Sequence, residues 1–414
     1  MARSFEILNA DLLKTCPPWP KQLQYMYMHD LAKRVHGVTK LAESMGDTEA
    51  TSRLDGSPKA VRIAVCGLGE IASNAHLPAI LRNPHKFQLA AIVDPNRNAA
   101  LETLENTFSL TESDIPVYSS LSQCLLDNSA AKNLDAVAVC TPSSVTLDLA
   151  EIALQAGKHV LVEKPPGDWR RLQGLEELAR DKHASFFTAY HTAACVGFQD
   201  AQEWLKMHGC QLERVQVTWK ESVRKWHPGQ VWVTEKNPTT NVCEGVLDMV
   251  FNPLSLLVAL LGPLQFQSSS LSVPSNWETP ISGHFRLAAP TNLSQSENQG
   301  KKSKSVPVTG DFAWNYEPTK PGEPEEIWTI DFHSSINSST LSLQDGGSQV
   351  FVDGRRTTTQ STASYPLEPE YENLYQQFSK LIENQASAID DVTPRLLEEI
   401  QSGARLTPSP AYDI

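Results

Sequence analysis

The sequence predicts an α/β protein in which a doubly wound parallel sheet is followed by an α+β region with a large, mainly antiparallel sheet. The first observation is that short apolar runs alternate with helical stretches. The runs are Val61–Cys66, Phe87–Val93, Ala136–Cys140 and Lys158–Val162. Strands of a parallel sheet are covered by helices on both faces and are therefore apolar along their whole length. The alternation thus predicts the parallel sheet.

The second observation is a change of pattern in the later part of the chain. Val215–Lys220, Glu326–Phe332 and Thr340–Leu343 alternate between polar and apolar residues. This period is typical of antiparallel strands that have one face in water. Helical patterns follow at Tyr371–Glu383 and Pro394–Ala404, so the later part is expected to have the α+β class.

The expected domain organisation is an N-terminal extension at residues 1–59, a parallel-sheet domain at 60–185 and an α+β domain at 186–414. A chain of 414 residues exceeds the usual size of one domain. The extension contains Cys16–Pro20, whose prolines exclude a helix there, and it is expected to pack on the outside. Residues 291–309 are rich in Ser, Asn, Gln and Lys and predict a flexible insertion.

The composition argues against several classes of function. With 48 acidic and 35 basic residues, the net charge of −13 disfavours nucleic-acid and membrane partners, which need a basic surface. The most apolar stretch, Val246–Leu261, is interrupted by Asp248, Asn252 and Pro253, so no membrane span is expected. Seven cysteines without CxxC spacing predict neither a disulfide framework nor a metal site. No signal peptide is recognisable, and a cytoplasmic location is expected.

The turn after the first predicted strand carries the pattern G-x-G-x-x-[GA]. Because the turn follows a strand and opens a helix, we predict a dinucleotide-binding Rossmann domain. The first glycine allows the tight turn, and the second lets a pyrophosphate approach backbone N–H groups at the positive end of the helix. A glycine turn without a ligand is the alternative interpretation. The residues assigned to the cofactor here are Gly67, Gly69, Glu70, Ile71 and Ala72.

The end of the second predicted strand bears on the choice of cofactor. Asp94 lies 25 residues after Gly69. A carboxylate at this place binds the adenosine ribose hydroxyls and repels a 2′-phosphate, which slightly favours NAD over NADP. Arg97 lies three residues further on and could contact such a phosphate, so NADP is the alternative cofactor.

A lysine follows the strand that precedes the predicted domain boundary. Glu163, Lys164 and Pro165 come directly after Lys158–Val162. Ligands of doubly wound sheets collect at the carboxyl ends of the strands, so this loop is expected to face the cofactor crevice. Lys164 can then donate to a substrate hydroxyl and lower its pKa. A surface lysine before a proline turn is the alternative.

Three motifs in this order resemble the glucose–fructose oxidoreductase, inositol dehydrogenase and rhizopine catabolism (Gfo/Idh/MocA) family of sugar oxidoreductases. They are Gly67–Ala72, Thr141–Pro142 and Ala156–Pro165, and the resemblance extends over about residues 60–405. It implies that Thr141, Pro142, Glu163 and Lys164 contact the cofactor. Within the family, Trp219–Gln230 and Gly245–Ser255 are similar to bacterial pyranose 1-dehydrogenases that act on D-galactose and L-arabinose.

The resemblance also implies catalytic residues. The wider family has D-x-x-x-H on its catalytic helix, whereas this chain has Asp248 and Asn252, as the galactose and arabinose enzymes do. Residues four apart share one helix face, so both side chains can hold the same hydroxyl-bearing carbon. Asp248 and Lys164 are then the candidates for the proton. The alternative for Asp248 is a role as a helix cap. The family has small residues where this chain has the bulky Met249–Phe251, so the identity of the sugar is left open.

A sugar pocket is implied around four further residues. A carboxylate and imidazoles would bind hydroxyl groups, and an aromatic ring would cover the C–H face of the sugar. The alternative for His191 is a structural role. The alternative for Trp219 and Trp226 is that one of them packs in the core. The residues are His191, Glu221, Trp226 and His227.

The expected activity is NAD(P)-dependent oxidation of the anomeric hydroxyl of an aldopyranose to an aldonolactone. Asp248, with or through Lys164, would take the O–H proton, and no metal is expected. The alternatives are the same chemistry on another alcohol or carbonyl, such as a secondary-metabolite intermediate, and a non-catalytic NAD(P)-binding regulator. The resemblance implies a homo-oligomer, a dimer or tetramer. A possible apolar face for this association is formed by Trp328, Ile330 and Phe332, and burial of this face within the monomer is the alternative.

Overall fold

The computed structural model describes residues 60–127, 133–226, 234, 245–290, 305–357 and 367–413. The extension at 1–59 lies outside the described residues. Within the described part, no helix is long and apolar enough to cross a membrane.

Six parallel strands form the first sheet, in the order β3-β2-β1-β4-β5-β6. This confirms the doubly wound parallel sheet. The order reverses between β1 and β4, and dinucleotides bind at such a reversal. The strands are β1 (Val61–Cys66), β2 (Phe87–Val93), β3 (Val117–Tyr118), β4 (Ala136–Val139), β5 (His159–Glu163) and β6 (Phe186–Ala189).

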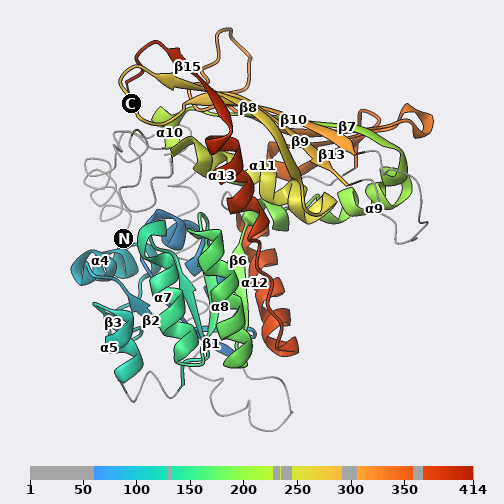
Figure 1. Ribbon diagram of the computed structural model, residues 1–414. Helices are drawn as coiled ribbons and strands as arrows, with labels where there is room; N and C mark the ends of the chain where they lie inside the picture. Colours follow the sequence, from blue (N-terminus) through green and yellow to red (C-terminus); the bar gives the residue numbers. More distant parts are fainter. Residues whose placement is uncertain are drawn as a thin grey trace, which may run out of the picture. The chain divides into compact units, whose positions relative to one another are not determined.

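Helices connect these strands. Figure 1 shows α7 and α8 side by side on one face of the sheet, and β4 in its middle is buried along its whole length. The helical segments are η1 (Ala72–His76), α3 (Leu77–Arg82), α4 (Arg97–Phe108), α5 (Leu121–Leu126), α7 (Ser143–Gln155) and α8 (Trp169–Asp181). Most of α4 belongs to a compact unit separate from Ala60–Arg97 and Pro116–Ile414.

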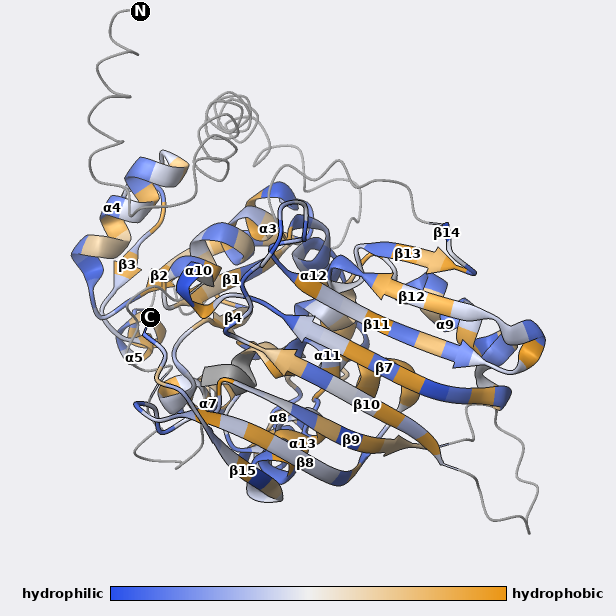
Figure 2. Cartoon of the chain, turned by 90° about the horizontal axis from the view of Figure 1, so that it is seen from above, coloured by the Kyte–Doolittle hydropathy of each residue, from blue (hydrophilic) through white to orange (hydrophobic). Residues whose placement is uncertain are grey.

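Nine strands form the second sheet, in the order β14-β13-β12-β11-β7-β10-β9-β8-β15. Only the β7–β10 and β8–β15 pairs are parallel, so the prediction of a mainly antiparallel sheet is confirmed. Figure 2 shows hydrophilic and hydrophobic residues alternating along these strands. The strands are β7 (Leu212–Lys220), β8 (Gln265–Pro274), β9 (Ser282–Ala289), β10 (Val306–Ala313), β11 (Ile327–Ser334), β12 (Thr340–Gln344), β13 (Gln349–Val352), β14 (Arg355–Arg356) and β15 (Ala404–Ser409).

Three helices, α9, α11 and α13, cover one face of the second sheet (Figure 1), and the core lies between them and the inward side chains of the strands. Helix α12 packs instead against α3 and the segments η1 and η2. The helices are η2 (His191–Ala194), α9 (Phe198–His208), η3 (Gly209–Gln211), α10 (Val223–Trp226), α11 (Gly245–Leu261), η5 (Ile336–Ser338), η6 (Asp345–Gly347), α12 (Glu368–Asn384) and α13 (Val392–Ser402).

Three boundaries differ from those expected. The parallel sheet continues past residue 185, because Phe186–Ala189 pairs with β5 as a fully buried edge strand. Strand β10 begins inside the predicted insertion, since Val306 and Val308 alternate with polar residues and are buried. The last helix ends at Ser402, and Ala404 begins a strand that pairs with β8.

The apolar face proposed for association belongs to the core of the protein itself. Ile330 and Phe332 are fully buried under the second sheet, and Trp328 is half-buried against the same core. Ile330 and Phe332 therefore stabilise the fold of the protein itself, and Trp328 packs against the same core.

Candidate functional site

The glycine turn has the geometry that a dinucleotide requires. Gly67 has φ of +84°, and a Cβ there would lie 2.6 Å from the carbonyl oxygen of Cys140, so only glycine fits. Its N–H donates to Val93 O at 2.8 Å. At Gly69, in contrast, a Cβ would meet no atom within 4 Å. The turn therefore leaves open space beside its backbone, which fits the approach of a pyrophosphate.

The chain after the turn enters a helical segment, as predicted. Glu70 and Ile71 open it, and Ala72 begins a π-helical turn that runs to His76. The side chain of Ala72 is completely buried, so this position is packed closely within the fold. The wider π turn was not expected from the sequence.

Asp94 is tied to the glycine turn. Its Oδ2 accepts from the N–H of Leu68 at 2.8 Å, and its Oδ1 accepts from the N–H of Asn96 at 2.8 Å. The guanidinium of Arg97 donates through Nε to Val117 O at 3.2 Å. The carboxylate is thus held in one orientation at the end of β2, where the ribose of a bound dinucleotide lies in this fold.

The loop after β4 lies against the same turn. A side chain on Gly67 would approach Thr141 Cγ2 to 3.0 Å as well as the carbonyl of Cys140. The hydroxyl of Thr146 donates to the carbonyl oxygens of Thr141 and Pro142, at 3.0 and 3.1 Å, and so fixes the loop at the start of α7. The structure therefore brings Thr141 and Pro142 to the cofactor turn.

Glu163 is a buried carboxylate with three donors. Its Oε2 accepts from the N–H of Lys164 at 2.7 Å. Its Oε1 lies 3.1 Å from His76 Nε2 and also accepts from the hydroxyl of Tyr371. Burial alone would raise the pKa of Glu163, but the hydrogen bond and charge of His76, with the help of Tyr371 and Lys164, lower it overall. The group is therefore ionised near neutral pH.

The sequence did not predict the partners of Glu163. His76 Nδ1 lies 2.9 Å from the hydroxyl of Tyr375. Both Tyr371 and Tyr375 belong to α12. Tyr375 is 299 residues from His76 along the chain, and Tyr371 is 208 residues from Glu163. A histidine at the end of the short segment η1 has no local feature that marks it as buried. No signal in the sequence connects it to α12.

Helix α11 carries both predicted catalytic residues of the second domain. Asp248 is the fourth residue of the helix, so the helix-cap interpretation is wrong for this position; its side chain lies outside the described part. Asn252 is half-buried, and its carbonyl oxygen accepts from the hydroxyl of Thr192 at 2.8 Å. This bond attaches α11 to η2, which begins at His191.

His191 contacts the same network as Glu163. Its ring stacks on Tyr371, with centroids 5.9 Å apart and planes inclined by 18°. The structure therefore brings His191, Tyr371 and Glu163 together, while Thr192 joins His191 to Asn252. Residues of β5, η2, α11 and α12 meet at this point.

Glu221 is held between two indole rings. Its Oε1 accepts from Trp314 Nε1 at 2.8 Å and its Oε2 accepts from Trp328 Nε1 at 3.0 Å. Trp219 is buried and stacks on Trp328 at 5.9 Å, so it is the core tryptophan of the pair considered above. Trp226 ends α10, but its side chain and all of His227 lie outside the described residues.

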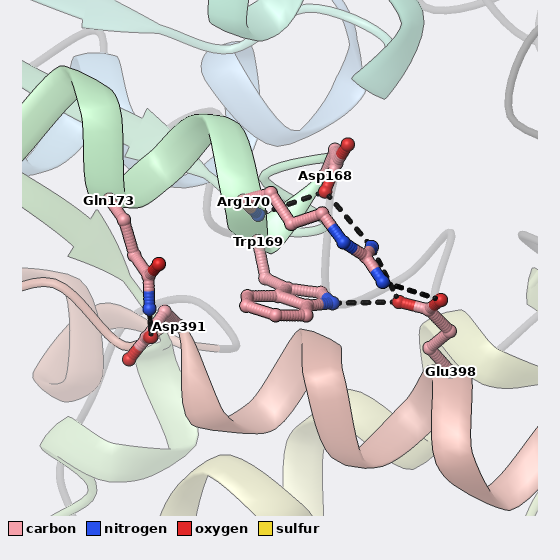
Figure 3. Close-up of polar contacts among 6 residues, drawn as sticks. All are labelled: Asp168, Trp169, Arg170, Gln173, Asp391 and Glu398. Atoms are coloured by element: carbon pink, nitrogen blue, oxygen red, sulfur yellow. Dashed lines mark hydrogen bonds and ion pairs between the residues drawn. The ribbon is translucent and has the colours of Figure 1, made fainter.

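A second polar cluster joins α8 to α13 (Figure 3). Trp169 Nε1 donates to Glu398 at 2.7 Å, and Arg170 donates to both oxygens of the same carboxylate, at 3.0 and 3.2 Å. Gln173 donates to Asp391 at 2.6 Å. The sequence did not predict this cluster, which fixes the last helix to the domain of the cofactor turn.

Glu398→Gln is expected to remove a pH-dependent part of the stability. Hydrogen bonds from Arg170 and Trp169 lower the pKa of Glu398, so the ionised carboxylate stabilises the folded state above the ordinary glutamate pKa. That stabilisation is lost as the pH falls through the lowered pKa. We expect the wild-type Tm to exceed that of the variant at pH 7 and the difference to vanish in acid. A constant difference at all pH values would contradict this.

The comparisons with known proteins identify the family of this chain. Residues 61–190 match the family model GFO_IDH_MocA, described as an oxidoreductase family with an NAD-binding Rossmann fold. The galactose 1-dehydrogenase of Pseudomonas fluorescens is 31% identical over 356 residues, which cover 85% of this chain and 99% of that protein.

Solved structures give the same result. The D-galactose-1-dehydrogenase protein of Rhizobium etli has a TM-score of 0.70 and 26% identity, and it covers 87% of this chain and 100% of its own. A 3-ketoreductase of Actinomadura kijaniata, solved with NADP and TDP-benzene, shares the fold at a TM-score of 0.64 and 18% identity, over 85% of this chain and 100% of its own. The chain therefore belongs to the GFO_IDH_MocA family of oxidoreductases with an NAD-binding Rossmann fold.

Proposed function

We propose that this protein oxidises the anomeric hydroxyl of a galactose-like or arabinose-like aldopyranose to the aldonolactone, with NAD as the favoured cofactor and NADP as the alternative. The observation that carries the proposal is the position of Asp248 and Asn252 one turn apart on α11, which is bonded through Thr192 to η2 and His191. The likeness to galactose 1-dehydrogenases along most of the chain supports it.

The cofactor would be held by the glycine turn and by Thr141 and Pro142, beside Asp94. When bound, NAD(P) supplies the hydride acceptor. Asp94 supports NAD because a carboxylate at the end of β2 would bind the ribose hydroxyls and repel a 2′-phosphate. Arg97 is the residue that would bind that phosphate if NADP is used.

The proton is handled by the protein. Asp248, with or through Lys164, takes the proton from the anomeric oxygen while the C1–H bond breaks, and the C1–O bond becomes the lactone carbonyl. Asn252 and His191 orient the sugar so that C1 faces the cofactor. Glu221, Trp226 and His227 complete the proposed pocket, although the indole bonds of Glu221 favour a supporting role for it.

A second candidate is the same chemistry on another alcohol or carbonyl, for instance a secondary-metabolite intermediate. The motivating feature is Met249–Phe251, which is bulkier than the family pattern. These three side chains are buried in the core of the second domain, and Phe251 stacks on Tyr190. These bulky side chains therefore pack the core, which favours a sugar substrate over the second candidate.

The test is a panel of aldopyranoses assayed by the reduction of NAD and of NADP. We expect D-galactose and L-arabinose to have a kcat/KM at least about tenfold above that of D-glucose, because a site that hydrogen-bonds a sugar hydroxyl rejects its epimer. We also expect NAD to be the better acceptor. Inactivity on every aldose would favour the second candidate. The homo-oligomer belongs to this proposal and rests on the resemblance, and a cytoplasmic location is part of the same proposal.

A further inference from the structure

We propose that Glu163 is a positioning residue that orients Lys164 and places a fixed negative charge beside it. The inference rests on the proposed function in that it takes Lys164 to act on the substrate hydroxyl. It assigns to the buried carboxylate a role that is separate from contact with the cofactor.

The first argument is geometric. Lys164 leaves the sheet at the carboxyl end of β5, and its backbone N–H donates to Glu163 Oε2 at 2.7 Å. The other oxygen of the carboxylate is held by His76 and Tyr371. A carboxylate fixed at both oxygens fixes the peptide unit that it binds, so the direction in which Lys164 leaves the strand is set by this network.

The second argument concerns the cost of burial. Glu163 is only 4% exposed, and a buried carboxylate is stable only when donors replace its water. The three donors come from the loop after β5, from η1 and from α12. His76 Nε2 donates to Glu163, and its Nδ1 lies 2.9 Å from the hydroxyl of Tyr375. The carboxylate thereby joins η1, which follows the glycine turn, to the loop that carries Lys164.

The third argument is electrostatic. The charge of Lys164 is among the causes that lower the pKa of Glu163, and the same attraction must favour the protonated lysine. An ammonium group at this place can stabilise the oxygen anion that forms as the sugar hydroxyl loses its proton. Among the described residues, the carboxylate also interacts electrostatically with the titratable groups of His76, Cys140, Tyr190 and Tyr371.

The test compares Glu163→Gln with Tyr375→Phe. The glutamine keeps the size of the side chain and removes its charge, whereas Tyr375→Phe disturbs His76 from its other side and leaves the charge. We expect the alkaline limb of the pH profile of kcat/KM to move to lower pH by about one to three units in Glu163→Gln. In Tyr375→Phe we expect no move. An unchanged profile in a folded Glu163→Gln protein would overturn the proposal.

A second measurement does not depend on the sugar. The lysines of the wild-type protein and of Glu163→Gln are reductively methylated with 13C, and the signal of Lys164 is assigned by its loss in Lys164→Arg. We expect this signal to titrate at lower pH in Glu163→Gln than in the wild-type protein, because the neighbouring negative charge is gone. The same titration in both proteins would overturn the proposal, whereas failure of the sugar panel alone would contradict only the proposed substrate.

Discussion

Gly67→Ala is expected to destabilise the protein severely, whereas Gly69→Ala is expected to leave the fold intact and impair cofactor binding. Gly67 combines a positive φ with a backbone carbonyl 2.6 Å from the place of a Cβ. A left-handed conformation costs a non-glycine residue about 1–2 kcal/mol, and a clash in a packed region costs a further 1–3 kcal/mol or so. The sum is a large part of the roughly 5–15 kcal/mol that holds a domain together.

Gly69 provides the matched control. A Cβ there meets no atom within 4 Å, so the apoprotein should accept it. The added methyl group would occupy the space that a pyrophosphate needs against the backbone. We expect thermal unfolding of the apoprotein to be nearly unchanged and the Kd for NADH, measured by fluorescence, to rise at least about tenfold, which corresponds to about 1.4 kcal/mol. Normal NADH binding by Gly69→Ala would show that the turn does not hold the pyrophosphate.

Asp248→Asn is expected to remove turnover without affecting NADH binding. An amide has almost the shape of the carboxylate but cannot accept a proton at neutral pH. Loss of a general base lowers the rate by about 10²–10⁴-fold, so kcat should fall within this range. Asp248 lies inside α11, and the substitution leaves the cofactor turn untouched.

Asp181→Asn is a suitable control for this variant. Asp181 ends α8 and is exposed, so loss of its charge should change neither kcat nor the Kd for NADH. Turnover close to the wild-type value in Asp248→Asn would remove Asp248 from the mechanism.

The cofactor half of the site could be predicted because its features are local. The strand Val61–Cys66, the glycine turn and Asp94 lie within 34 consecutive residues, and the hydrogen bond between Leu68 and Asp94 closes that unit. Apolar runs identified the strands of the parallel sheet directly, since burial on both faces leaves a strong pattern. The short strands Val117–Tyr118 and Phe186–Ala189 were missed because two and four residues leave little pattern.

The other part of the candidate site depends on contacts between distant parts of the chain, which local sequence patterns do not predict. Glu163 was identified from its motif, but its partners lie on η1 and α12. Glu221 was assigned to the sugar from the resemblance, and two indoles from other segments turn out to hold its carboxylate. A two-residue period tells which side chains share a face of a strand. It does not tell what covers that face. For this reason the sequence could not decide whether the core or the surface of the protein contains Trp328, Ile330 and Phe332.

Transfer of the anomeric hydrogen to the cofactor tests the central claim most directly. D-galactose that carries deuterium at C1 is incubated with the protein and NAD, and the reduced cofactor and the sugar product are analysed by mass spectrometry and NMR. We predict one deuterium at C4 of the nicotinamide and a galactonolactone as the first product. A reduced cofactor without deuterium, or a product oxidised at another carbon, would contradict the proposed reaction.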